Sequence, residues 1–173
     1  MKARWTFRWV IATVLLGGAT FVPCSISAAT LAHATSPIVN VWTEPSSGYG
    51  FLDSAIGAAR HSIDMSMYEL SDTTIEDELI ARARAGVDVR VLLDAAYEGT
   101  THNANAYALL HASKVHVEWA PSNQIFHAKY VVIDSHVAYI GTGNLETIDY
   151  SSTRDFWVED DRAADVSVVV STF

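Results

Sequence analysis

Two side chains that suit phosphate chemistry stand two residues apart in an otherwise apolar stretch. Residues 127–134 read His-Ala-Lys-Tyr-Val-Val-Ile-Asp. The apolar run predicts a buried strand, and residues two apart in a strand point to the same face, so His127 and Lys129 are expected to project together. An imidazole can attack phosphorus or carry protons, while an ammonium can hold the non-bridging oxygens. The pair therefore indicates phosphate chemistry.

A short glycine-containing segment follows at the end of the next expected strand. Residues 141–144 read Gly-Thr-Gly-Asn. Glycine lets backbone approach a ligand closely, which makes Gly143 a candidate for substrate binding. The amide of Asn144 offers a neutral donor to a phosphoryl oxygen. The spacing is not that of a Walker loop, because no Lys-Ser/Thr pair follows.

Two carboxylates complete the candidate set. Asp155 lies eleven residues beyond Asn144 (155 − 144) and precedes an apolar strand. Its carboxylate could accept a hydrogen bond from the second imidazole nitrogen of His127. That bond would fix the tautomer of the ring and stabilise its protonated form. The alternative is that Asp155 forms an ion pair with Arg154 or Arg162. Asp134 is followed by Ser at a hairpin, which favours a turn role over a catalytic one.

The elements that must position these residues alternate between strand and helix patterns. This alternation predicts an α/β fold with a mixed sheet and helices on both faces. Strands are expected at 37–42, 62–70, 87–94, 115–119, 127–133, 137–140 and 156–158. Helices are expected at 51–59, 72–84, 103–113 and from 163 onward, with a loop at 98–101.

The pattern His-x-Lys-x4-Asp followed by Gly-Thr-Gly-Asn resembles the motif of the phospholipase D superfamily. The resemblance extends from about Ser36 to the end of the chain and implies a half-domain of that fold. It also implies a reaction in which one histidine forms a covalent phosphohistidine and a second protonates the leaving alcohol. No metal or other cofactor is required in that reaction.

Mapped onto this chain, the resemblance gives each candidate a role. His127 would be the nucleophile or the acid, and Lys129 and Asn144 would stabilise the phosphoryl charge. Asp155 stands where the family has the carboxylate that orients the histidine. Asp134 would support the hairpin, away from the phosphate.

Because the chain carries a single motif, a complete site needs a second copy. The resemblance to small exported bacterial nucleases of the superfamily predicts a homodimer with His127 near its two-fold axis. The alternative is that the chain is the front half of a longer protein with two motifs.

Three functions compete for this chemistry. The first is a phosphodiesterase of phospholipase D type that hydrolyses a phospholipid headgroup bond. The second is a metal-independent endonuclease acting on DNA or RNA, and the third is an inactive half-domain that only binds phosphorylated ligands. The formal charge is −9, and −12 (8 − 20) without the basic residues at positions 2, 4 and 8. Such an acidic body disfavours tight nonspecific nucleic-acid binding, and lipid substrates are frequent in the family that the chain resembles, so the lipid substrate is preferred.

The histidines do not predict a metal centre. His102, His111, His116 and His136 match no usual set of ligand spacings. The single cysteine, Cys24, lies in the N-terminal segment that is expected to be removed as an export signal. The chain that remains after removal has no thiolate ligand.

The N-terminus is typical of an export signal. Three basic residues precede an apolar run at 9–19 that is short for a membrane span. Two segments of small residues, ending at Ala29 and at Ala34, fit a cleavage site, and cleavage after Ala34 is favoured. Such cleavage leaves 139 residues (173 − 34), and residues 35–173 are expected to form one domain. The sequence therefore predicts a secreted or periplasmic protein, with an uncleaved amphipathic anchor as the alternative.

Overall fold

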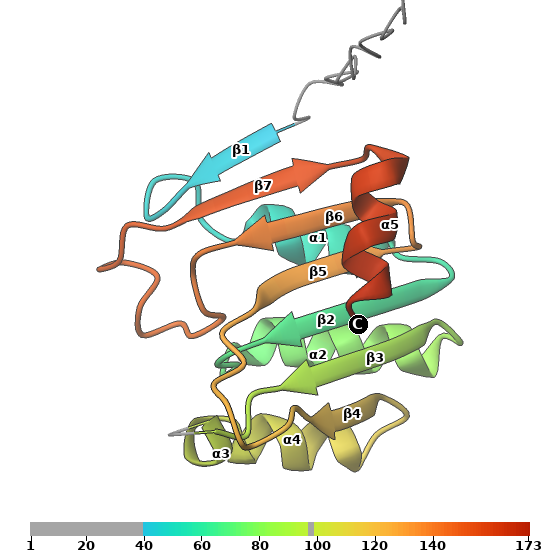
Figure 1. Ribbon diagram of the computed structural model, residues 1–173, viewed down its shortest axis with the longest axis vertical. Helices are drawn as coiled ribbons and strands as arrows, with labels where there is room; N and C mark the ends of the chain where they lie inside the picture. The colour runs from blue at the N-terminus through green and yellow to red at the C-terminus, as the bar shows by residue number, and fades with distance from the viewer. Residues whose placement is uncertain (1–39, 97–98) are drawn as a thin grey trace, which may run out of the picture. The chain divides into compact units, whose positions relative to one another are not determined.

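One seven-stranded mixed sheet forms the centre of the fold in the computed structural model, which describes residues 40–96 and 99–173. The strand order is β1-β7-β6-β5-β2-β3-β4 (Figure 1). Strand β2 pairs in parallel with β3 and β3 with β4, while the other neighbours are antiparallel. The strands are β1 Asn40–Thr43, β2 Ser62–Met67, β3 Asp88–Leu93, β4 His116–Trp119, β5 Lys129–Ile133, β6 Val137–Gly141 and β7 Phe156–Asp160.

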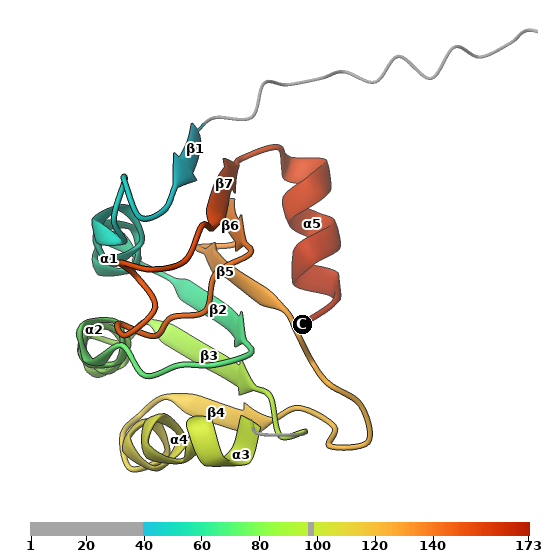
Figure 2. The same cartoon turned by 90° about the vertical axis from the view of Figure 1, so that its left-hand side faces the viewer.

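Helices cover both faces of this sheet, which confirms the predicted fold class (Figure 2). One face carries α1 Gly50–Ala58, α2 Thr73–Arg84 and α4 Ala104–His111, and the other carries α5 Ala163–Ser171, while the short helix α3 Gly99–His102 lies beside α4. Most of the buried apolar side chains lie in one cluster with Leu52, Leu79 and Leu110, and a smaller cluster includes Tyr130, Val132 and Val166. Strand β5 contributes to both clusters because its alternate residues face opposite sides.

No described helix is long and apolar enough to span a membrane. The expected leader, 1–34, and the start of the expected first strand lie outside the described residues.

Local sequence explains the boundaries of α2. The Asp72 side chain caps the helix by accepting from the backbone N–H groups of Thr74, at 2.8 Å, and Ile75, at 3.4 Å. Arg82 and Arg84 lie in the last turn, where cations complement the helix dipole. Gly86 follows with a φ of 97°, a backbone conformation that stops the helix.

The region 98–113 departs from the prediction. A loop was expected at 98–101 and one helix at 103–113, but residues 99–102 form α3 and α4 begins only at Ala104. The break is Asn103, which is fully buried. Its side chain accepts from Leu70 N–H at 2.8 Å and donates to the carbonyls of Tyr68, at 2.8 Å, and Asp94, at 3.2 Å. These bonds hold the two short helices against the ends of β2 and β3.

The segments that carry most of the candidate residues lie at one edge of the sheet. Met67, the last residue of β2, is opposite Lys129, the first residue of β5. Gly141, the last residue of β6, is opposite Trp157 near the start of β7. The segments that follow β2, β3 and β6 and that precede β5 and β7 therefore converge there, although they are distant in sequence (Figure 1).

Candidate functional site

Lys129 and His127 lie together at this convergent edge, but not as neighbours within one strand. Strand β5 begins at Lys129 because its ladder with β2 ends there, so the expected strand at 127–133 is two residues too long. The Lys129 ammonium donates to the backbone carbonyl of His127 at 3.3 Å. The Tyr68 ring joins them: its centroid is 4.5 Å from that of the His127 ring and 4.8 Å from Lys129 Nζ.

The electrostatic environment favours the neutral form of His127. Its side chain is exposed, and partial desolvation together with the Lys129 ammonium lowers the pKa of the imidazole, against a smaller opposing effect of Asp94. A neutral imidazole is the form that can act as a nucleophile.

Lys129 is a buried cation with carboxylates around it. Only 6% of the residue is exposed. Burial lowers the pKa of its ammonium, and the carboxylates of Glu69, Asp155 and Asp94 act in the opposite direction. A largely desolvated ammonium interacts strongly with a phosphoryl oxygen, since little water screens the charge.

Asp94 supports the segment that carries His127, a role that the sequence did not reveal. It follows β3 directly and is fully buried. Its Oδ1 accepts from the backbone N–H of Phe126 at 2.6 Å, and its Oδ2 is buried without a hydrogen-bond partner. The only available signal was an acidic residue at the carboxyl end of an apolar strand.

The glycines of the segment 141–144 serve packing. A Cβ at Gly141 would lie 2.4 Å from the ring of Trp157, which is fully buried. A Cβ at Gly143 would lie 2.6 Å from the Tyr49 hydroxyl oxygen and 3.0 Å from Asp155 Cγ. Gly143 therefore lets the backbone approach Tyr49 and Asp155 closely, and its part in substrate binding stays a prediction.

Asn144 reaches the site through a residue that the sequence analysis missed. Its side-chain amide donates to Glu69 Oε2, while its own Oδ1 is buried without a partner. Glu69 is 8% exposed, and burial, followed by the neighbouring Glu146, raises its pKa to about 7. Glu69 follows β2 in the chain. No residue next to it in the sequence suggests a functional role, so the sequence alone does not point to it.

Asp155 also lies at this edge, in an arrangement different from the one expected. Its Oδ1 accepts from the Thr142 hydroxyl at 2.8 Å, and its charge acts on Lys129. Within the described part of the chain, no hydrogen bond joins Asp155 to His127. The orientation of His127 by Asp155 is therefore not established in a single subunit.

Asp134 lies just beyond the other end of β5, about 16 Å from Lys129 at the usual rise per strand residue. Its Oδ1 accepts from the backbone N–H groups of Arg60, at 3.1 Å, His61, at 2.7 Å, and Ser62, at 2.9 Å. These hydrogen bonds lower the pKa of the carboxyl group against its partial desolvation. Asp134 holds the start of β2 and is not brought to the site.

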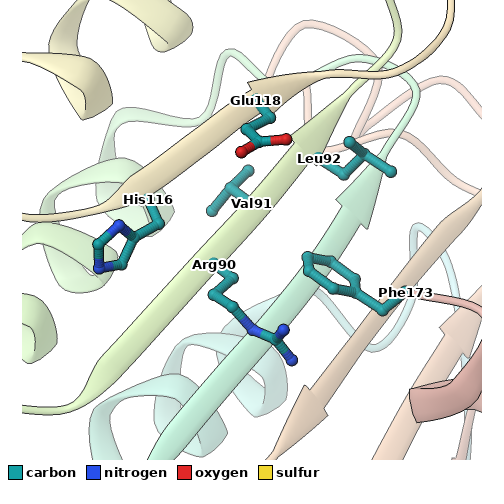
Figure 3. Close-up of a pocket in the computed structure, with 6 residues that line it drawn as sticks. All are labelled: Arg90, Val91, Leu92, His116, Glu118 and Phe173. Carbon is teal, nitrogen blue, oxygen red and sulfur yellow. The ribbon is translucent and has the colours of Figure 1, made fainter.

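A separate hollow of about 210 Å³ lies away from these residues, between β3, β4 and the end of the chain (Figure 3). Arg90 projects toward it, but the Arg90 guanidinium is bound to Asp64 at 2.7 Å and lies 4.8 Å from the centroid of the Phe173 ring. The hollow contains none of the candidate residues, so the convergent edge remains the candidate site. Its lining residues are Arg90, Val91, Leu92, His116, Glu118 and Phe173.

Known proteins of one superfamily resemble this chain in sequence and fold. Residues 52–173 match the family model described as "Cardiolipin synthase, PLD-like domain". A phospholipase D from Rickettsia bellii is 30% identical over 113 residues, which are 64% of this chain and 54% of that protein. The match therefore spans about half the length of that relative.

Solved structures show the same fold. The phospholipase D family member Nuc from Salmonella typhimurium superposes with a TM-score of 0.70 at 23% identity, over 77% of this chain and 89% of that one. NucT from Helicobacter pylori gives a TM-score of 0.67 at 18% identity, over 77% and 91% of the two chains. Since the family model matches well over half of the residues, the chain belongs to the phospholipase D-like family that the resemblance indicated.

Proposed function

We propose that this protein is a phosphodiesterase that uses His127 as its nucleophile and hydrolyses the headgroup bond of a phospholipid. The observation that carries the proposal is the contact of the buried Lys129 ammonium with the backbone of an exposed His127 whose environment favours the neutral ring. Nucleophile and charge stabiliser are thereby held together before a substrate arrives.

The proposed reaction has two displacements at phosphorus. A neutral imidazole nitrogen of His127 attacks, an N–P bond forms, and the bond from phosphorus to the leaving alcohol breaks while an acid protonates that oxygen. Water then attacks phosphorus with the acid's conjugate base taking its proton, and the N–P bond breaks. Lys129 stabilises the charge that develops on the non-bridging oxygens in both steps.

The acid is proposed to come from a second copy of the chain. Another histidine close to this edge, His102, contacts the carboxylates of Glu69 and Glu146. We therefore propose a homodimer in which His127 of the partner subunit faces His127 across a two-fold axis. An isologous contact at this edge supplies both groups from a single motif.

Two exposed isoleucines favour a lipid over a nucleic acid. Ile125, two residues before His127, is 55% exposed, and Ile148, two residues after Glu146, is 81% exposed. Exposed apolar side chains in the segments that carry His127 and Glu146 suit acyl or interfacial contacts, whereas the acidic composition opposes a polyanion. The related protein from Rickettsia bellii carries the name phospholipase D, in agreement with this choice.

The proposal is tested by incubating the purified protein with bis(p-nitrophenyl) phosphate in excess EDTA, and with phosphatidylcholine vesicles or plasmid DNA in parallel. We expect chelator-resistant release of nitrophenolate and of choline, both lost in His127→Ala and kept in His136→Ala, a matched exposed histidine at the other end of β5. Cleavage of DNA without release of choline would overturn the lipid assignment. Absence of all turnover from a folded protein would leave a binding module instead.

We further propose that the protein is exported, as its N-terminal sequence predicts. In the native host, N-terminal sequencing of protein recovered from the periplasm or medium should begin at Thr35. Recovery of the protein only from the cytoplasm, with Met1 retained, would reject export.

A further inference from the structure

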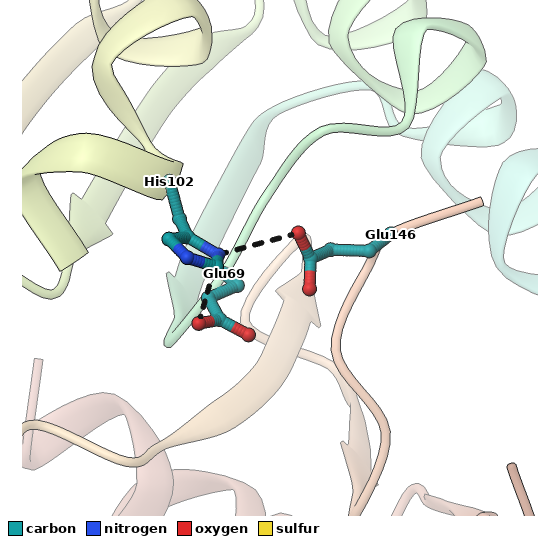
Figure 4. Close-up of side chains that lie close together, drawn as sticks. All are labelled: Glu69, His102 and Glu146. Carbon is teal, nitrogen blue, oxygen red and sulfur yellow. Dashed lines mark ion pairs between the residues drawn. The ribbon is translucent and has the colours of Figure 1, made fainter. Parts of the chain in front are cut away.

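A second cluster of ligating side chains lies next to the proposed catalytic residues. Glu69, His102 and Glu146 converge from the segments after β2, in α3 and after β6 (Figure 4). His102 Nδ1 is 3.2 Å from Glu69 Oε1 and 3.8 Å from Glu146 Oε1. One ligand atom from each residue lies within 4.8 Å of the others. We propose that these three side chains form a binding site for a divalent transition-metal ion, with Zn²⁺ as the representative ion.

The distances suit such an ion. Zinc binds imidazole nitrogen and carboxylate oxygen at about 2.0–2.2 Å, so two ligands of a tetrahedral ion lie about 3.3 Å apart. The separation of 3.2 Å to Glu69 matches this value, and the 3.8 Å to Glu146 is about half an ångström longer. A small movement of the Glu146 side chain would complete three protein ligands, and water would supply the fourth.

The backbones that carry the ligands are already fixed. Leu70 and Leu145, each next to a ligand, form an isolated parallel bridge, and Leu145 N–H donates to the Glu69 carbonyl at 3.0 Å. Asn103, next to His102, is bonded to the backbone on both sides of Glu69, at Tyr68 and Leu70. Binding therefore requires little ordering of the chain, which favours affinity.

The second oxygen of Glu69 is also fixed. Asn144 donates to Glu69 Oε2, which leaves Oε1 directed at His102. Metal-ligating carboxylates are commonly held in this way by a hydrogen bond to the oxygen that faces away from the ion. Glu69 also connects the metal site to the proposed phosphate site. Its carboxylate accepts from Asn144, and its charge acts on the Lys129 ammonium.

Charge and exposure point in the same direction. Glu69 and Glu146 are largely buried, with 10% and 13% of their side chains exposed, and two close carboxylates need a positive charge or a shared proton. His102 is 38% exposed, so an ion and its water ligand can reach the cluster from that side. A doubly charged ion neutralises both carboxylates where the imidazole alone cannot.

The test is equilibrium binding of Zn²⁺ by untagged full-length protein that has been freed of metal with EDTA and dialysed. Isothermal titration should give one Zn²⁺ ion per chain and a higher unfolding temperature with added Zn²⁺. His102→Gln and Glu146→Gln should each weaken binding about tenfold or more, and the exposed control His136→Gln should not. Wild-type affinity in both cluster variants would overturn the proposal.

A measurement on unaltered protein covers the case in which a variant does not fold. Titration with paramagnetic Mn²⁺ should broaden the amide signals of Leu70, Asn103 and Leu145 first. Broadening centred elsewhere, for example around His116, would place the ion at another site and refute this one. Repeating the titration on His127→Ala separates this inference from the proposed activity, because metal binding should survive when turnover is lost.

Discussion

At the scale of single residues, the charge state of His127 depends on two neighbours of opposite sign. The Lys129 ammonium lowers the pKa of the imidazole, together with desolvation, and the Asp94 carboxylate raises it. A pKa below the ordinary 6.5 keeps the ring neutral, and therefore nucleophilic, into mildly acidic solution.

This balance predicts opposite shifts in two variants. Lys129→Met should raise the pKa of His127 toward its ordinary value, because a like charge is removed, and Asp94→Asn should lower it further. Both are measured by titrating the His127 ring signals by NMR, with the exposed Lys114→Met as control. An unchanged or lower pKa in Lys129→Met would show that the two groups are not close in solution.

Asp134 is expected to matter for stability and not for chemistry. Asp134→Ala leaves the N–H groups of residues 60–62 without their acceptor and should lower the free energy of unfolding by about 2 kcal/mol. Activity per folded molecule should not change. A fall in turnover without a fall in stability, measured by urea unfolding, would assign Asp134 to the site after all.

The same carboxylate predicts a pH dependence. Because its folded pKa is below the ordinary value of 3.8, ionised Asp134 stabilises the fold above that value. The stabilisation is lost as the pH falls through the folded pKa. The stability difference between wild type and Asp134→Asn should therefore be constant near neutral pH and shrink below about pH 3.8. A difference that grew on acidification would contradict this sign.

At the scale of elements, the end of β6 fits against β7 only because residue 141 has no side chain. Gly141→Ala would place a methyl group 2.4 Å from the buried Trp157 ring and should cost about 1–3 kcal/mol through forced repacking. Gly50→Ala is the control, since nothing lies within 4 Å of the added carbon. Chemical denaturation compares the two, and equal stabilities would mean that the sheet edge adapts freely.

Element boundaries in this protein follow from contacts more than from local preference. The α2 cap and its stop at Gly86 were readable from the sequence because the groups involved are neighbours along the chain. The break between α3 and α4 was not, because Asn103 bonds to backbone 33 and 35 residues earlier.

At the scale of the whole molecule, the proposed homodimer predicts how inactive subunits affect active ones. If each site needs His127 from both chains, mixing equal amounts of wild type and His127→Ala after subunit exchange should leave about a quarter of the dimers active. Independent subunits would instead leave about half of the total activity, because each wild-type subunit would work in any dimer. The mixture is assayed with bis(p-nitrophenyl) phosphate, and light scattering gives the mass of the species; a monomer with full activity would remove the dimer from the proposal.

The sequence by itself indicated the family and the fold class and singled out His127 and Lys129 as the central pair, although it placed both in one strand. His127 and Lys129 are close along the chain, and the alternation of strand and helix patterns is local, so both could be read without coordinates. Only the tertiary structure decided that Asp94 holds the segment before His127, that Asp134 binds the backbone of residues 60–62, and that Glu69, His102 and Glu146 meet. The physical reason is that these contacts depend on which strand ends share an edge of the sheet, and that is set by long-range pairing such as Met67 with Lys129.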